Sequence, residues 1–463
     1  MVGFVLCLLT STAAVAAGAE VATAQDAIPG WPMTGRDAAH TGSADGPGPP
    51  YREAWRTSVP GGLAAGPVVS DGMVIGLGRD SIIALDARSG ETLWEAERST
   101  GRSGSPAVSG GLVIHASGVE SQSSVIARSL EDGRERWRVF PGSSVRAGLV
   151  AEGERVYAAT LEGEVLALDV ADGEEAWRLD LDGAVEAAPA VSEGLLVVVL
   201  EQRSAGTSAV VAVDTETGEE EWRFTSLPSG AGATPPSVAD GVAYVGAADA
   251  RVHALDLDTG AERWSTRTQS TFVLPPPVFT AGQVPAVAGD PIVADIAHLE
   301  RFDARTGREL WSFRFLDGLY RSGVAAVGGY ALVGDFSGGL SAVDLDSGLL
   351  VWEMDLGRGP ATSPAADGDR VYAGLVGLKD TAEPSSGSEE ATDEPASRRV
   401  GAIVALEHDS SEGLQSVQSE STLFPLRAVL GFLAAALAVI LASVSLFRFA
   451  LGPRRRAQAE ESS

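Results

Sequence analysis

The feature that most constrains the fold of this chain is a short pattern that recurs seven times. Each copy has an apolar run ending in Ala-Leu-Asp or a close variant, then a turn that closes on glycine, then a tryptophan. The spacing is about forty residues, the period at which blades of a β-propeller repeat. The copies are Ala84–Trp94, Ser129–Trp137, Ala167–Trp177, Ala212–Trp222, Ala254–Trp264, Arg301–Trp311 and Ala342–Trp352. The repeat therefore predicts an all-β ring of similar sheets.

Each unit also contains an earlier pair of short apolar runs joined by Asp-Gly, Gly-Gly or Glu-Gly, which is typical of a β-hairpin. Examples are Gly66–Gly78, Ser105–Gly118, Ala188–Leu200 and Pro235–Ala247. A blade then has four strands, the third ending in Ala-Leu-Asp and the fourth beginning near the tryptophan. We expect the Asp to accept hydrogen bonds from turn amides and the glycine to adopt a left-handed conformation. We expect the tryptophan ring to lie between neighbouring blades, with its N–H bonded to one backbone partner.

The number of blades follows from how the two ends of the repeat fit together. An eighth set of strands, Ser363–Gly377 and Val400–Asp409, follows the last copy but contains no tryptophan. Near the other end, Tyr51–Val59 has a tryptophan strand with no Ala-Leu-Asp strand before it. Joining the two closes the ring and leaves no broken sheet. We therefore predict an eight-bladed propeller closed by the N-terminal strand, with seven blades as the alternative.

Both ends of the chain predict a relation to a membrane. The first 25 residues are apolar or small and are interpreted as a signal peptide. From Ala428 to Phe447 no residue is charged, which is long enough to cross a hydrocarbon core of roughly 30 Å. Because arginines follow this segment, the C-terminus is expected in the cytoplasm and the ring outside. The predicted organisation is signal peptide 1–25, lead-in 26–50, propeller 51–410, linker 411–424, single transmembrane helix 425–448 and cytoplasmic tail 449–463.

Charge excludes one class of partner. The formal net charge is −29, with 34 basic and 63 acidic residues, a single lysine (Lys379) and no asparagine. Nucleic-acid binding needs a basic surface, so it is not expected. The composition resembles that of proteins from salt-loving archaea, although a GC-rich genome that avoids Lys and Asn codons would produce the same bias.

Two segments depart from the repeat. Residues 378–399 lie inside the last blade, are rich in Ser, Glu and Pro, and are predicted to be a disordered acidic loop. The stretch Thr271–Val287 adds prolines and apolar side chains, among them Phe272 and Phe279. We interpret this stretch as a contact for a partner, with an irregular blade as the plainer alternative.

The Ala-x-Asp-x-x-Thr-Gly-x-x-x-Trp pattern resembles the repeat of the PQQ-like (pyrroloquinoline-quinone-type) β-propeller family. The segment Trp31–Gly42 is similar to the lead-in before the first blade in that family. The resemblance covers about residues 31 to 409 and implies one of two kinds of protein. Quinoprotein dehydrogenases hold the quinone and a calcium ion on the propeller axis. Non-catalytic scaffolds are similar to the propeller lipoprotein of the bacterial outer-membrane assembly machine.

The residues favour the scaffold. The resemblance implies that a dehydrogenase would carry a vicinal-cysteine disulfide and an asparagine ligand for calcium, yet the chain has one cysteine, Cys7, and no asparagine. A G-x-S-x-G nucleophile turn is also missing. Strings such as Asp256–Gly260 lack the twelfth-position Glu of a calcium loop. The five histidines have no paired ligand spacing for zinc, and His253, directly before an Ala-Leu-Asp strand, is interpreted as a packing residue.

Sequence alone therefore assigns no catalytic, cofactor-binding or metal-binding residue. It predicts a membrane-anchored, extracytoplasmic propeller that binds a protein or an envelope component through one rim, because loops on a rigid scaffold are where recognition concentrates. A quinoprotein-like oxidoreductase with a divergent site is the first alternative. A carbohydrate-binding or adhesive surface module is the second.

Overall fold

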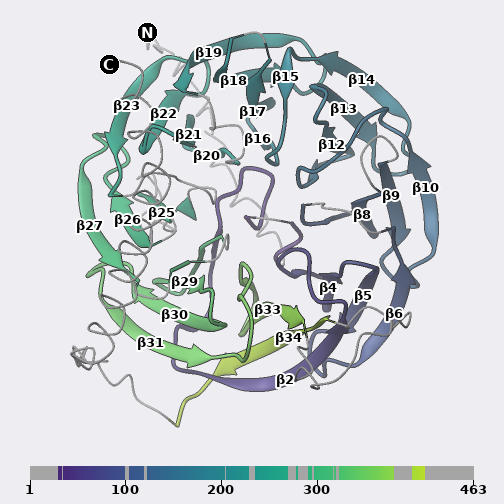
Figure 1. The fold of residues 1–463 in the computed structure, drawn as a ribbon, viewed down its shortest axis with the longest axis vertical. Helices are drawn as coiled ribbons and strands as arrows, with labels where there is room; N and C mark the ends of the chain where they lie inside the picture. The colour runs from purple at the N-terminus through teal and green to yellow at the C-terminus, as the bar shows by residue number, and fades with distance from the viewer. Residues whose placement is uncertain are drawn as a thin grey trace, which may run out of the picture. The chain divides into compact units, whose positions relative to one another are not determined.

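The fold was analysed in a computed structural model. The structure describes residues 30–33, 35–99, 104–118, 123–203, 205–228, 235–269, 278–279, 290–294, 297–315, 318–319, 323–379 and 399–411. The described residues form eight sheets arranged around a ring, antiparallel except for the short parallel pair of β1 with β28, and they include no helix (Figure 1). The predicted eight-bladed propeller is confirmed, and the seven-bladed alternative is wrong.

The first four blades follow one another along the chain. Blade 1 consists of β3 (Val68–Ser70), β4 (Met73–Leu77), β5 (Ser81–Asp86) and β6 (Thr92–Glu97). Blade 2 consists of β7 (Ala107–Ser109), β8 (Leu112–Ser117), β9 (Ser124–Ser129) and β10 (Glu135–Val139). Blade 3 consists of β11 (Val150–Glu152), β12 (Arg155–Ala159), β13 (Glu164–Asp169) and β14 (Glu175–Asp180). Blade 4 consists of β15 (Gly183–Ala184), β16 (Ala190–Ser192), β17 (Leu195–Gln202), β18 (Thr207–Asp214) and β19 (Glu220–Pro228).

The other four blades complete the ring. Blade 5 consists of β20 (Ser237–Ala239), β21 (Val242–Ala247), β22 (Arg251–Asp256) and β23 (Glu262–Arg267). Blade 6 consists of β24 (Val278–Phe279), β25 (Pro291–Ala294), β26 (His298–Phe302) and β27 (Glu309–Arg314). Blade 7 consists of β28 (Ala325–Val327), β29 (Tyr330–Gly334), β30 (Gly339–Asp344), β31 (Leu350–Asp355) and the short β1 (Ser43–Ala44). Blade 8 consists of β32 (Ala365–Asp367), β33 (Arg370–Lys379), β34 (Arg399–His408) and β2 (Tyr51–Pro60).

Blade 8 joins the two ends of the propeller. The N-terminal strand β2 pairs antiparallel with β34, from Tyr51 opposite His408 to Pro60 opposite Val400. This is the closure that the orphan tryptophan strand predicted. Because β2 is the outer strand of the last blade, the ring closes through backbone hydrogen bonds between segments more than three hundred residues apart.

A tryptophan and a glycine lock seven of the eight blades to the next one. Trp94 of β6 donates its indole N–H to the carbonyl of Leu130 in blade 2, at 2.7 Å. Gly133 lies flat against the same ring, and a Cβ there would come within 2.6 Å of an indole carbon. The remaining indole-to-carbonyl bonds are Trp55–Ala87, Trp137–Val170, Trp177–Thr215, Trp222–Leu257, Trp264–Ala304 and Trp311–Leu345. For these seven tryptophans the predicted interblade position and single backbone partner are confirmed, whereas the ring of Trp352 in blade 7 packs edge-on against that of Tyr51 in blade 8.

The lead-in forms an inner hoop around the axis of the ring. Its backbone bonds to the first strands of successive blades, at Val69, Val108, Val191, Val238 and Ala326. In Figure 1 this segment is the purple trace that runs through the middle of the ring. The lead-in therefore ties the inner ends of blades 1, 2, 4, 5 and 7 together before the chain turns outward into β2.

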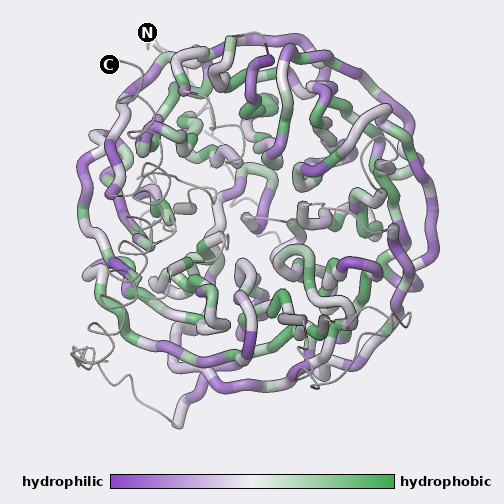
Figure 2. Tube along the Cα trace, in the orientation of Figure 1, coloured by the Kyte–Doolittle hydropathy of each residue, from purple (hydrophilic) through white to green (hydrophobic). Residues whose placement is uncertain are grey.

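Apolar residues concentrate on the inner and middle strands of each blade. All but the last residue of β5 are buried, whereas β6 alternates exposed residues with the buried Trp94. Figure 2 shows this contrast as green inner strands within a mostly hydrophilic outer rim. Burial of apolar surface between the sheets supplies the main stabilisation, at roughly 25 cal/mol for each Å².

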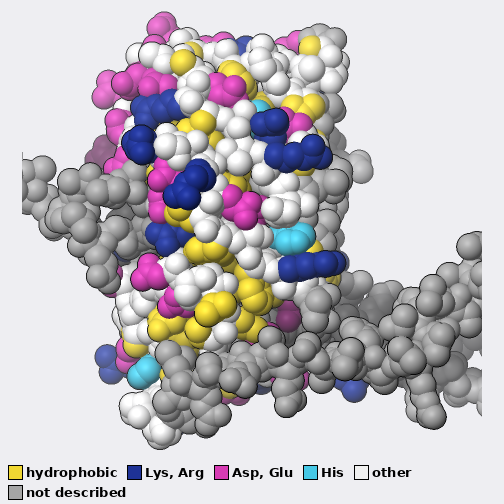
Figure 3. All heavy atoms as spheres, turned by 90° about the vertical axis from the view of Figure 1, so that its left-hand side faces the viewer, with side chains coloured by type: hydrophobic (Ala, Val, Ile, Leu, Met, Phe, Trp, Pro, Cys, Tyr) yellow, Lys and Arg dark blue, Asp and Glu magenta, His cyan; other side chains and the backbone are white. Residues whose placement is uncertain are grey.

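The rim itself carries interspersed charges of both signs, as Figure 3 shows for one side of it. On four outer strands a glutamate two residues before the tryptophan pairs with an arginine directly after it. These pairs are Glu53–Arg56, Glu135–Arg138, Glu175–Arg178 and Glu220–Arg223. Charged side chains on an edge strand discourage pairing with a foreign strand.

Several predicted segments lie outside the described residues. These are the signal peptide, the transmembrane helix and tail, most of the linker, most of the acidic loop and most of Thr271–Val287. Strands β33 and β34 extend to Lys379 and from Arg399, so they include both ends of the segment predicted as a loop. Within the described ranges no helix has the length and apolarity needed to cross a membrane.

Candidate binding surface

The ring has two faces that differ in how variable they are. The Asp-turn face carries the turns between third and fourth strands, such as Asp86–Gly90, and the turns between first and second strands. The loop face carries the turns between second and third strands, such as Asp335–Gly338, and the connections between blades. The lead-in runs beside the first-to-second turns, since Gly328 bonds to Ala44. The loop face therefore holds the segments that differ most from blade to blade.

The Asp-turn face satisfies its own polar groups. In blade 1, Asp86 accepts hydrogen bonds from the backbone N–H of Ser89 at 2.7 Å and of Arg88 at 3.0 Å. These bonds to the carboxylate lower the pKa of Asp86. The equivalent Asp256 accepts from Thr259 and from Arg263. The predicted role of the Ala-Leu-Asp carboxylates is confirmed, and no group of metal-ligating side chains occurs among the described residues.

Blade 7 presents a cavity of about 270 Å³ toward the loop face. It lies where the β29–β30 turn meets the ends of β30 and β31, and Phe336 in that turn is 46 % exposed. The carboxylate of Asp335 shapes the turn, because its Oδ1 accepts from the N–H groups of Ser337, Gly338 and Gly339. The residues that line the cavity include Asp335, Ser337, Ser341, Glu353, Met354 and Asp355.

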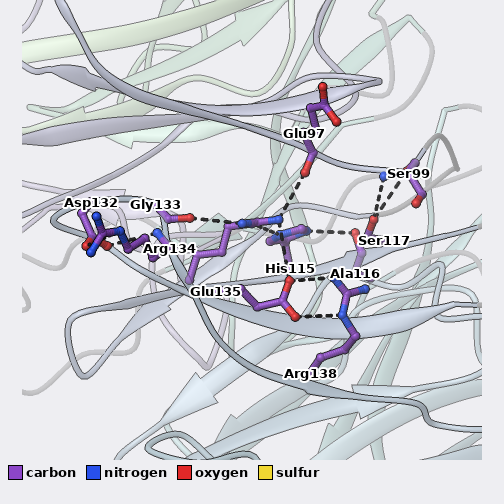
Figure 4. A network of polar contacts seen from close by, with 11 residues as sticks. Glu97, Ser99, His115, Ala116, Ser117, Asp132, Gly133, Arg134, Glu135 and Arg138 are labelled. Atoms are coloured by element: carbon purple, nitrogen blue, oxygen red, sulfur yellow. Dashed lines mark hydrogen bonds and ion pairs between the residues drawn. The ribbon is translucent and has the colours of Figure 1, made fainter.

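Blade 2 contains a buried polar cluster centred on His115 of β8 (Figure 4). Arg128 points its Nε at the Nε2 of His115 at 3.4 Å and bonds to the carbonyls of Gly133 and of Glu97 in blade 1. The Nδ1 of His115 faces the carbonyl of Ala116 at 3.3 Å. Because a guanidinium only donates, Nε2 must accept and Nδ1 must carry the proton. The cluster therefore bridges blades 1 and 2 with a neutral histidine.

Burial and the nearby arginines lower the pKa of His115 to about 3. The unfolded chain, with a histidine pKa near 6.5, then binds a proton in a pH range where the folded ring does not. Stability is therefore expected to fall with decreasing pH from 6.5 toward 3, by roughly 1.4 kcal/mol for each pH unit. Chemical denaturation at pH 7 and 4.5 checks this. The variant His115→Gln keeps a hydrogen-bond acceptor and a donor, so between pH 7 and 4.5 its free energy of unfolding should fall by about 2 kcal/mol less than that of the unaltered protein. An equal fall in both proteins would contradict the lowered pKa of His115.

The structure places the five histidines in separate settings. His40 lies on the lead-in, fully buried, with Nδ1 at 2.9 Å from the carbonyl of Pro236. His253, interpreted above as a packing residue, is buried with its ring beside that of Phe224. Its ring nitrogens also contact the carboxylates of Glu262 at 2.7 Å and Asp249 at 3.3 Å. His115, His298 and His408 belong to blades 2, 6 and 8.

Sequence reasoning missed the polar cluster and the cavity, although both leave a signal. In blade 2 the Ala-Leu-Asp motif becomes Ala-Arg-Ser at 127–129, which puts a charged residue where leucine is the rule. In blade 7, Leu349 directly before the fourth strand and Leu350 at its start stand where most copies have charged residues. Departures from the consensus of a repeat were therefore more informative than the consensus itself.

Eight blades of four or five strands, seven of them bonded to the next blade by a tryptophan, define a propeller protein of the PQQ-like class. The family described as outer membrane protein assembly factor BamB matches residues 51–139, 121–224 and 206–374, and the chain belongs to this family. A BamB from Burkholderia pseudomallei is 28 % identical over 283 residues, which cover 57 % of this chain and 69 % of that protein.

Solved structures agree on the fold. The crystal structure of BamB from Moraxella catarrhalis matches with a TM-score of 0.59 at 17 % identity, covering 77 % of this chain and all of that one. A europium-containing methanol dehydrogenase matches with a TM-score of 0.62 at 14 % identity, covering 82 % of this chain and 98 % of that one. At these identities the similarity shows a shared fold, and the two structures represent both kinds of protein that the repeat implies.

Proposed function

We propose that this chain is a non-catalytic scaffold of the cell envelope that binds a protein partner through its loop face. Residues 425–448 anchor it in a membrane with the ring outside the cytoplasm. The observation that carries the proposal is the contrast between the faces. The Asp-turn face uses its carboxylates on its own turns, whereas the loop face offers the exposed Phe336 beside an open cavity. Membership in a family named for outer-membrane protein assembly supports the same role.

The loop face also suits protein recognition because the ring beneath it is rigid. Its connections join blades that are fixed by seven indole-to-carbonyl bonds. Loops held on a rigid scaffold lose little conformational entropy when they bind a partner, so binding is less costly. On this face Phe140, 68 % exposed, follows the outer strand of blade 2. The segment Thr271–Val287 contains β24 of blade 6, and the part before β24, which joins blade 5 to blade 6 in the sequence, is included in the proposed contact.

The alternative, a quinoprotein-like oxidoreductase, is favoured by one finding. A quinohemoprotein alcohol dehydrogenase from Pseudomonas putida is 30 % identical over 154 residues, which cover 30 % of this chain and 21 % of that protein. The residues present do not fit such a site. The chain has no asparagine and only one cysteine, and its described part brings no metal-holding group together.

Two measurements on the full-length protein in detergent test the proposal. Titration with pyrroloquinoline quinone and calcium, followed by tryptophan quenching and a dye-linked alcohol oxidation assay, should show neither saturable binding nor turnover. Cross-linking in native membranes should capture a defined set of envelope proteins. The double variant Phe140→Ser with Phe336→Ser should reduce this capture several-fold while leaving thermal unfolding unchanged. Saturable quinone binding with turnover, or capture that is indifferent to the loop face, would overturn the proposal.

A further inference from the structure

The outer strand of blade 7 is one of two outer strands without a basic residue, the other being β6 of blade 1. Where four other outer strands pair a glutamate with an arginine across the tryptophan, β31 has Leu350 and Glu353 at these two positions, so this pair cannot form. The strand contains no basic residue at all. Val351 is the extra residue of a β-bulge, because Trp352 lies opposite Ala342 and Leu350 opposite Val343. Beyond the bulge, residues 352–355 form a regular edge.

Apolar side chains are exposed at the start of this strand. Leu349, directly before β31, is 63 % exposed, and Leu310 on the neighbouring β27 is 36 % exposed. Leu350 and Val351 are only partly buried. Figure 3 views the rim from the side where Figure 1 shows β23 and β27, and hydrophobic side chains gather in its lower part. Leu349, Leu350 and Val351 are consecutive in the chain, and a group of apolar residues that is open to solvent on an edge marks an interaction site more often than a single one does.

The blade 7 cavity lies at the other end of the same strand, and the charged residues that line it are all acidic. Glu353 and Asp355 of β31 line it together with Asp335. Among the described residues no basic side chain forms an ion pair with any of the three. A six-residue strand is about 20 Å long. Apolar and acidic subsites are therefore separated by the length of one short extended peptide.

We propose that the β31 edge, from Leu349 to the blade 7 cavity, binds an extended segment of a partner protein that combines apolar residues with a lysine or arginine. The segment lies along residues 352–355 and adds to the sheet, as peptides do on exposed edge strands. Its apolar side chains cover Leu349 and Leu310, and its cationic side chain enters the cavity. A second copy of this chain fits poorly, because the net charge of −29 opposes self-association. This proposal names a second surface for the scaffold role proposed above and rests on it.

A labelled peptide of alternating valine and lysine is the probe, and a valine–glutamate peptide of equal length is its control. Fluorescence anisotropy with the full-length protein in detergent should show saturable binding of the first peptide and none of the second. Added salt should weaken the binding, because the cationic contact is partly exposed. The variant Leu349→Ser with Glu353→Gln should raise the dissociation constant at least tenfold.

Matched substitutions on blade 1 separate this site from general attraction to an acidic surface. Leu93 is 48 % exposed on β6, and Glu95 directly follows Trp94 as Glu353 follows Trp352. The variant Leu93→Ser with Glu95→Gln removes the same charge and similar apolar area, so it should bind the peptide as the unaltered protein does. Equal weakening by both variants, or no binding by the unaltered protein, would overturn the proposal. Thermal unfolding of both variants should match that of the unaltered protein.

The same variants distinguish this proposal from the scaffold role. If cross-linking captures envelope proteins equally well with and without the β31 substitutions, the edge is not a docking site, although the scaffold role stands. If the peptide binds at β31 but cross-linking captures no envelope protein, the scaffold role is wrong, whereas the edge is still shown to bind an extended peptide.

Discussion

A disulfide between positions 58 and 402 is expected to stabilise the ring by about 5 kcal/mol, because it joins the two ends of the propeller directly. Ser58 of β2 lies opposite Ala402 of β34, and residues opposite each other in an antiparallel pair have Cα atoms within bridging distance. The bridge would close a loop of roughly 340 residues. Closing a loop of that size removes much of the entropy of the unfolded chain.

The control for this bridge tests the register of the last blade. In the variant Thr57→Cys with Ala402→Cys, the first cysteine belongs to the residue paired with Ile403, so its side chain points to the other face of the sheet. We expect the 58–402 pair to lose its free thiols on oxidation, which mass spectrometry detects. The denaturation midpoint should rise by the amount that corresponds to the expected gain in stability. The 57–402 pair should keep its free thiols and gain no stability. If the two pairs behave alike, the strand that closes the ring is in another register.

The propeller fold was predictable because each repeat unit contains the local sequence signals that form one blade. The Asp-Gly and Gly-Gly turns set hairpins, and the Asp of Ala-Leu-Asp together with the turn glycine fixes the third-to-fourth turn, so each blade forms from local signals. Closure was also predictable, since the orphan strands around Trp55 and before His408 had no other partner. Eight blades follow from counting these signals.

The surface was less predictable, because the contacts that form it are not local. Glu353 follows Trp352 by one residue, but it lines a cavity only because the turn at Asp335 folds back beside it. Likewise, Arg128 reaches from blade 2 to a carbonyl of Glu97 in blade 1. Such contacts depend on how neighbouring sheets pack against each other. The repeat pattern of the sequence does not predict this packing. The Ala-Arg-Ser and Leu-Leu departures mark the blades concerned without showing the geometry.

The variant Gly260→Ala should destabilise the ring by about 3 kcal/mol. Gly260 has a φ of +69°, and a Cβ there would lie 2.5 Å from the ring of Trp222 in the preceding blade. A left-handed alanine costs about 1 kcal/mol, and forcing an atom into a filled contact costs about 1–3 kcal/mol more. Equilibrium unfolding in guanidinium chloride measures the sum.

Gly241, in the same blade, separates the two costs. Its φ is +66°, but a Cβ there would meet only the end of the Arg263 side chain, at 3.9 Å. Gly241→Ala should therefore cost about 1 kcal/mol, the conformational part alone. In a Trp222→Ala background the steric part disappears, so Gly260→Ala should then cost no more than Gly241→Ala does. If Gly260→Ala keeps its full cost without the indole, the glycine is required by the turn and not by the neighbouring blade, and the tryptophan–glycine contact does not lock the blades together.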